Sequence, residues 1–94
     1  MGPEGVRDDA IPRMPRGVRL KRDAQSGEWL LLAPERIIKT NSSAVEILSR
    51  CTGDASIAAI VDDIAAAFDA PRPTVDADVK ALIASLASRR LVDL

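Results

Sequence analysis

The sequence predicts an α+β fold of winged-helix-like type, with an N-terminal three-stranded antiparallel sheet followed by a three-helix bundle. Three observations lead to this prediction. Short strand-like runs occupy residues 16–40, and apolar residues recur with helical spacing from residue 44 to residue 86. Each helical segment carries a single apolar stripe, so the helices must pack against one another and against one face of the sheet. At 94 residues, of which 47% are hydrophobic, the chain is long enough for one such core.

The strand-like runs span Arg16–Arg22, Glu28–Ala33 and Arg36–Thr40. The first alternates apolar and basic residues, and a loop that ends near Gly27 joins it to the second. Pro34 suits the second position of a type I turn between the other two, because its φ angle is already fixed. The third run precedes the helices, so it has a strand neighbour on one side only. Its other edge must be hidden, blunted or used.

The first two helical segments have recognisable ends. Ser43 and Glu46 form the pattern of a capping box, and Gly53 is expected to stop the first helix. The second helix is expected to begin after a cap at Asp54 or Ser56 and to stop at Ala70-Pro71-Arg72-Pro73. The stripes expected to face the core are Ala44, Ile47, Leu48 and Cys51 in the first helix, and Ile57, Ile60, Val61, Ile64, Ala65 and Phe68 in the second.

The third helix is expected to begin at a cap formed by Thr74. Asp76 and Asp78 would then lie in its first turn, where acidic groups complement the helix dipole. Residues 91–94 are expected to form a short extended tail that pairs with the sheet. The apolar stripe of this helix consists of Val75, Val79, Leu82, Ile83 and Leu86.

Composition excludes several classes of function. The formal net charge of −1 argues against general nucleic-acid binding. The chain has no His, which rules out His-based catalytic triads and mixed-ligand zinc sites, and it has no glycine-rich phosphate loop. We therefore expect no catalysis, no cofactor and no metal.

The cellular compartment and the domain boundary that we expect follow from the single cysteine and from the composition of the N-terminal residues. Cys51 alone excludes an intrachain disulfide and suits a reducing cytoplasm. No apolar run approaches the ~18 residues of a membrane span, and no secretory signal pattern opens the chain. Residues 1–15 mix Gly, Pro and charges without periodicity, so we expect a flexible leader or linker there and a domain over residues 16–94.

Three short segments stand out in the order in which they occur. They are Pro15–Leu20, then Gly27–Arg36 with Leu-Leu-Ala-Pro-Glu-Arg at its end, then Asn41 at the start of a helix. In these segments and in the order of its elements, the chain over residues 15–94 resembles the PqqD family, the peptide chaperones of pyrroloquinoline quinone biosynthesis.

The resemblance implies a RiPP recognition element, a module that captures the leader of a ribosomally made precursor peptide. Its partner would be the PqqA precursor, held for the radical SAM enzyme PqqE. The peptide would add as a further strand beside the third strand, against the third helix. Family members occur alone or fused to another enzyme of the pathway, so the resemblance also allows a fusion upstream.

The residues themselves support such a site. A free strand edge offers backbone donors and acceptors to an extended peptide, and side-chain pockets supply selectivity. The third helix would provide the pockets, and Arg36, Lys39 and Lys80 would pair with acidic peptide side chains. The candidate peptide-binding residues are Arg36, Ile37, Ile38, Lys39, Thr40, Val75, Val79, Lys80, Leu82, Ile83 and Leu86.

Other interpretations stay open. The stripe of the third helix serves mainly as core in one of them, with only some of its residues lining a groove. Ile37 and Ile38 point to opposite faces of a strand, so one of the two is expected to be plain core. A winged-helix protein would instead bind DNA through the third helix, although Asp76 and Asp78 would meet phosphates unfavourably. A structural adaptor or a strand-exchanged dimer is the remaining alternative.

Overall fold

The sheet is a meander of three antiparallel strands. The computed structural model describes residues 6–94, and its strands are β1 (Arg19–Arg22), β2 (Trp29–Ala33) and β3 (Arg36–Thr40), with β2 in the middle. The three helices follow, so the predicted order of sheet and then helices is confirmed. β1 begins later than expected because Arg16 and Gly17 form a turn, in which Gly17 adopts a φ of 86°.

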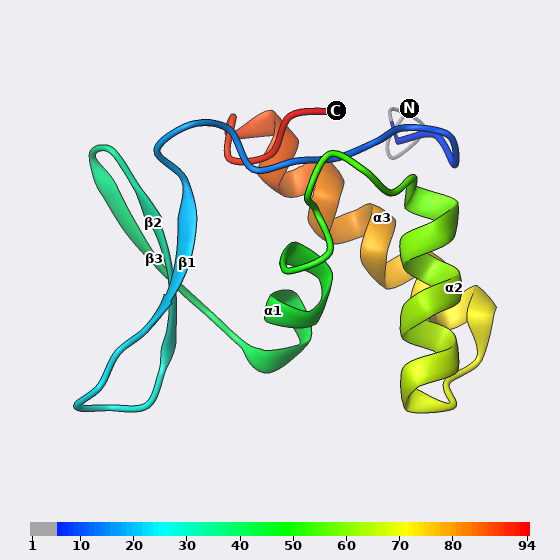
Figure 1. The fold of residues 1–94 in the computed structure, drawn as a ribbon, viewed down its shortest axis with the longest axis horizontal. Coiled ribbons are helices and arrows are strands. Elements are labelled where there is room, and N and C mark those ends of the chain that lie inside the picture. The colour runs from blue at the N-terminus through cyan, green and yellow to red at the C-terminus, as the bar shows by residue number, and fades with distance from the viewer. Residues whose placement is uncertain (1–5) are drawn as a thin grey trace.

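The helices lie together to one side of the sheet, as Figure 1 shows. The first is α1 (Ser42–Leu48) and the second is α2 (Ile57–Phe68), which packs against α3 (Arg72–Ser88). Ser56 caps α2 by accepting a hydrogen bond from the amide of Ala59, as one of the two expected caps would.

The capping box predicted for the first helix is wrong. The cap of α1 is Asn41, whose side-chain oxygen accepts a 2.8 Å hydrogen bond from the amide of Ala44. An amide side chain fills this position as well as serine does. Glu46 instead accepts a hydrogen bond from Arg50, one helical turn further on. The helix also ends at Leu48, well before Gly53, although Cys51 is buried as its place on the stripe predicted.

The start predicted for the third helix is wrong as well. Pro71 is the residue that precedes α3, and Pro73 lies in the first turn, where a missing amide hydrogen costs nothing. The prolines expected to stop the second helix thus begin the third. Thr74 makes no cap, and Asp76 and Asp78 lie beyond the first turn.

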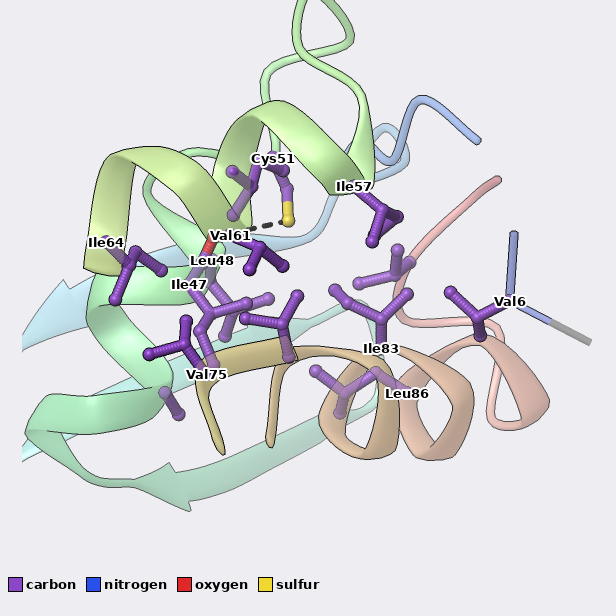
Figure 2. Close-up of a cluster of buried hydrophobic side chains, with 14 of the residues drawn as sticks. Val6, Ile47, Leu48, Cys51, Ile57, Val61, Ile64, Val75, Ile83 and Leu86 are labelled. Carbon is purple, nitrogen blue, oxygen red and sulfur yellow. Dashed lines mark hydrogen bonds between the residues drawn. The ribbon is translucent and has the colours of Figure 1, made fainter. Parts of the chain in front are cut away.

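One aliphatic cluster forms the core, and the helices supply most of it. Figure 2 shows the side chains of α1, α2 and α3 directed at one another. Among the strand residues only Leu31 is buried in this cluster. Phe68, predicted to belong to the core, is 54% exposed, because α2 ends there and the chain reverses through the left-handed Asp69.

The two ends of the described chain pack on the helices. Arg13 pairs by its backbone with Asp93 and Thr52, and these pairings hold the N-terminal segment beside the C-terminal tail. The prediction that the tail pairs with the sheet is therefore wrong. Val6 is buried, so packing extends beyond the boundary expected at residue 16. Residues 1–5 lie outside the part of the chain that the structure describes.

Candidate functional site

β3 is an edge strand, and some of its backbone N–H and C=O groups have no strand to pair with in the described part of the chain. Within residues 6–94 it pairs with β2 on one side, and no strand pairs with its other side. The two residues that flank the two-residue turn between β2 and β3 form a hydrogen-bonded pair, as in any tight hairpin. Because such pairs alternate, every second residue from Arg36 onwards directs its N–H and C=O groups to β2. The backbone groups of Ile37 and Lys39 point to the open edge.

The side chains of β3 divide between the two faces of the sheet. Ile38 stands opposite Leu31, which is 1% exposed, and Ile38 itself packs against the core. Since side chains alternate along a strand, Arg36 and Thr40 share this inner face. Ile37 lies on the outer face and is 70% exposed. Of the two isoleucines, Ile38 is therefore the core residue.

α3 presents two neighbouring stripes of side chains with different environments. The buried stripe forms the core, and Leu82 belongs to the second stripe, where it is half-buried and packs against the edge of the core cluster. The second stripe is the part of α3 that stays accessible. The buried stripe consists of Val75, Val79, Ile83 and Leu86, and the second stripe of Asp78, Leu82 and Ser85, followed by Arg89 directly after the helix.

One hydrogen bond and one shared cavity relate β3 and the residues that follow it to the second stripe of α3. At one end, the guanidinium of Arg36 donates a 3.0 Å hydrogen bond to the carbonyl oxygen of Arg89. At the other end, a cavity of about 260 Å³ joins the start of α1 to α3. Its lining includes Ser42 and Ser43, which follow β3, together with Val75 and Asp78 of α3. We call β3 and the second stripe of α3 the β3–α3 site.

Lys80 lies away from this site, although it was a candidate for it. Its ammonium nitrogen is 2.6 Å from a carboxylate oxygen of Asp8 and 3.2 Å from one of Asp76. The hydrogen bonds that Lys80 donates to these two carboxylates raise its pKa, and the bond to Asp8 lowers the pKa of that carboxyl group. On a helix with 3.6 residues per turn, Lys80 and Leu82 point in nearly opposite directions. Lys80 thus ties the N-terminal segment to α3.

Sequence reasoning missed the cavity at the junction of the helices. Helical spacing predicts Phe68 to be a core residue, yet it lies on the cavity lining beside Ile64 of α2. Ser42, Ser43 and Asp78 also line the cavity, and none of them follows an apolar stripe. The signal that was available is the position of Ser42 and Ser43, directly after the edge strand and at the start of a helix.

The described residues carry no feature of a metal centre. Within residues 6–94, no group of three or more His, Cys, Asp or Glu side chains is placed to hold a metal ion. Cys51 is buried, donates a hydrogen bond to the carbonyl oxygen of Ile47, and has its pKa raised to about 11 by burial. Such a thiol is a core group rather than a nucleophile. None of the helices in residues 6–94 has the length and apolarity required to cross a membrane.

Comparison with protein families gives one match that spans most of the chain. The model for coenzyme PQQ synthesis protein D (PqqD) matches residues 28–92, which include β2, β3 and all three helices. The chain belongs to the PqqD family. Its relatives in that family include a PqqA binding protein of Rhodopseudomonas palustris, 39% identical over 89% of this chain and 82% of the relative. Another is the PqqA binding protein of Xanthomonas axonopodis pv. citri, 38% identical over 96% of this chain and 98% of the relative.

Two solved PqqD structures resemble the present one. The solution NMR structure of the PqqD truncation of Methylobacterium extorquens PqqCD, described as a functional and stand-alone RiPP recognition element, superposes with a TM-score of 0.84. It is 32% identical in sequence, and each chain covers the whole of the other. The crystal structure of PqqD from Xanthomonas campestris is 36% identical and superposes with a TM-score of 0.61, covering 95% of this chain and 99% of its own. The sheet-then-helices fold is thus the fold of PqqD.

Proposed function

We propose that this chain is a non-catalytic peptide chaperone that binds the PqqA precursor by strand addition and presents it to the radical SAM enzyme PqqE. The open edge of β3 is the observation that carries the proposal. Relatives over nearly the whole length of the chain are named PqqA binding proteins, which supplies the identity of the peptide. The solved relative described as a RiPP recognition element supports the same class of activity.

The backbone of β3 supplies the affinity in this mechanism. An added strand bonds to the N–H and C=O groups of Ile37 and Lys39, which is at most four hydrogen bonds. Each contributes roughly 0.5–1.5 kcal/mol net of the bonds to water that it replaces. Ordering the peptide costs several kcal/mol, so side-chain burial must supplement these bonds.

The side chains of the β3–α3 site supply the selectivity. A peptide strand beside β3 points alternate side chains to the inner face, where they meet Ile38, Thr40 and Leu82. Arg36 stands at one end of this contact and suits an acidic peptide residue. The buried stripe of Val75, Val79, Ile83 and Leu86 backs the contact from within the core.

The described N-terminal segment is compatible with a fused enzyme upstream, as the resemblance allows. In Figure 1 the described part of this segment starts beside α2 and α3, at the end of the molecule away from the sheet, and runs from there to β1. A domain attached there would leave the edge of β3 accessible. The reaction on the peptide belongs to the partner enzyme in this proposal, and the chaperone contributes only binding and orientation.

Replacing Lys39 with Pro tests strand addition, with Lys39→Thr as the matched control. Proline removes the outward amide hydrogen but leaves the ladder between β2 and β3 intact, since position 39 donates to the open edge. We expect the PqqA peptide encoded by the same genome to bind about tenfold more weakly to Lys39→Pro. This is the effect of losing roughly one backbone hydrogen bond and weakening the adjacent ones. Lys39→Thr should stay within about twofold, because it keeps the amide.

Isothermal titration calorimetry measures both affinities, and a titration of the ¹⁵N-labelled chain locates the contact. Shifts should concentrate in residues 36–40 and on the Leu82 side of α3. Equal affinities of the Pro and Thr variants, both folded, would argue against an added strand at this edge. Duplex DNA serves as the contrasting ligand, and saturable shifts on α3 with DNA would favour the nucleic-acid alternative.

A further inference from the structure

The sheet carries a second surface that the proposed peptide site does not use. Side chains opposite each other in the register share a face, and the face away from the helices contains two rows. We call these two rows the outer face. One row is Arg19, Leu32 and Ile37, and the other is Lys21, Leu30 and Lys39.

The centre of the outer face is apolar and uncovered. Ile37 is 70% exposed, the highest value among the large apolar side chains described. Leu30 and Leu32 are only half-buried and lie outside the core cluster. Leu32, Ile37 and Arg19 also line a broad hollow beside the turn between β2 and β3. The helices lie on the other side of the sheet (Figure 1), so nothing in the described chain covers this centre.

The rim of the outer face is basic. Lys39 has an acidic neighbour, Glu28, at 3.8 Å, and Glu35 lies in the adjacent turn. Arg19 and Lys21 have no acidic group within ion-pair distance among residues 6–94. Asp23, which follows the first strand, attracts Lys21 only from beyond ion-pair distance. The charge that lacks an ion-pair partner in the two rows is therefore positive, on Arg19 and Lys21. Its complement is a surface with an apolar centre and acidic side chains around it.

Strand addition would extend this face with the peptide itself. A strand paired with β3 continues both rows, so half of the peptide's side chains stand on the outer face beside Ile37 and Lys39. The other half point inward and anchor the peptide. The side chains left accessible on the bound peptide therefore lie on the same surface as the basic rim.

We propose that the outer face is the docking surface for the enzyme that modifies the bound peptide, and that this enzyme meets it with an apolar patch rimmed by acidic residues. The inference rests on the proposed function, because it takes the peptide to be a strand beside β3. One surface of the enzyme would then contact the chaperone and the outward side chains of its peptide together. Charges at the rim would steer the encounter and make it dependent on salt.

The double variant Arg19→Glu/Lys21→Glu tests this docking surface. Both residues lie on β1, which is separated from β3 by β2, so the peptide affinity should stay within twofold of wild type. The affinity of the peptide-loaded chain for PqqE should fall at least tenfold in low salt, and the wild-type affinity should decline as salt is added. Arg7→Glu/Arg13→Glu is the matched control, because it makes the same change in charge on the N-terminal segment. The control should leave both affinities within twofold.

Calorimetry with PqqA and then with PqqE separates the proposals. Failure of the wild-type chain to bind PqqA would overturn the proposed function itself. Normal PqqA binding with equal PqqE affinity in both double variants would overturn only the docking surface. A loss of PqqA affinity in Arg19→Glu/Lys21→Glu would assign the outer face to the peptide instead. Wild-type self-association that this variant abolishes, without any change in PqqE affinity, would assign the face to a second copy.

Discussion

The sheet and the helices of this chain differ in how far their apolar side chains are buried. The helices and the segments beside them hold nearly all of the buried cluster, whereas the strands contribute Leu31 alone. The outer face of the sheet leaves Leu30 and Leu32 half-buried and Ile37 70% exposed. The buried core therefore resides in the helical part of the molecule, and the sheet carries Ile37, the most exposed of the large apolar side chains described.

This division teaches how a chain of this size combines a core with binding surfaces. A small domain has little apolar area to bury, so side chains left on the surface reduce its stability unless something else covers them. Here three of them, Leu30, Leu32 and Ile37, are grouped on one face of a single sheet. The proposed docking surface assigns a polypeptide partner to that group.

The largest expected effect contrasts the core of α3 with the outer face of β3. Ile83 is 0% exposed, and Ile83→Ala should lower the free energy of unfolding by about 2–5 kcal/mol through lost burial and the cavity left behind. Ile37→Ala removes a side chain that is 70% exposed and should change the free energy of unfolding by less than about 0.5 kcal/mol. Chemical denaturation of both variants measures the difference. Equal losses would mean that the outer face is buried in solution.

A smaller effect distinguishes the observed helix cap from the predicted one. Asn41→Ala removes the side-chain acceptor of the Ala44 amide and should cost about 1 kcal/mol of unfolding free energy. Thr74→Ala removes a side chain that makes no cap hydrogen bond, so we expect a change below about 0.5 kcal/mol. Thermal or urea unfolding tests the pair, and a larger loss for Thr74→Ala would contradict the observed start of α3.

The last effect is absent at neutral pH, appears only in alkali and concerns Cys51. Burial raises the pKa of this thiol from 9.0 to about 11, so the unfolded chain loses its proton first as the pH rises. The contribution of this pKa shift to the free energy of unfolding is fully present below pH 9. It is lost progressively as the pH rises from 9 to 11. Between pH 8 and pH 10, the free energy of unfolding of the wild type should therefore fall by roughly 1 kcal/mol more than that of Cys51→Ala. Urea unfolding at both pH values tests this, and equal losses would show that Cys51 is accessible to solvent.

Local chemistry made most of the fold predictable. The span of β3 is as the sequence predicts, because a proline turn and an adjacent helix bound it on both sides. The core stripe of α2 is also as expected up to Ile64, since helical spacing directs those side chains to one face. The helix starts failed where several residues were chemically able to cap. Asn41 and Ser43 both qualify, and only the path of the chain into α1 selects one of them.

The candidate site was less predictable than the fold. Periodicity identified the apolar side chains of α3 but not which of them the sheet and the other helices cover. Val79 and Ile83 are 0% exposed, while Leu82, next to Ile83 in the sequence, stays half-buried beside the edge of the core. Lys80 was a candidate because it is charged and near the stripe, but Asp8 from the N-terminal segment binds it. That contact joins residues far apart in the sequence, so no local sequence pattern predicts it.

The sequence by itself determined the order of the strands and helices, the aliphatic character of the core and the place of β3 at an edge of the sheet. Turn residues, apolar periodicity and composition act over a few neighbouring positions, which is why they can be read from the chain. Only the tertiary structure decided which backbone groups of β3 face the open edge, which stripe of α3 stays accessible and which face of the sheet is left uncovered. Each of these depends on packing between distant segments, and burial is a property of the assembled chain rather than of any residue within it.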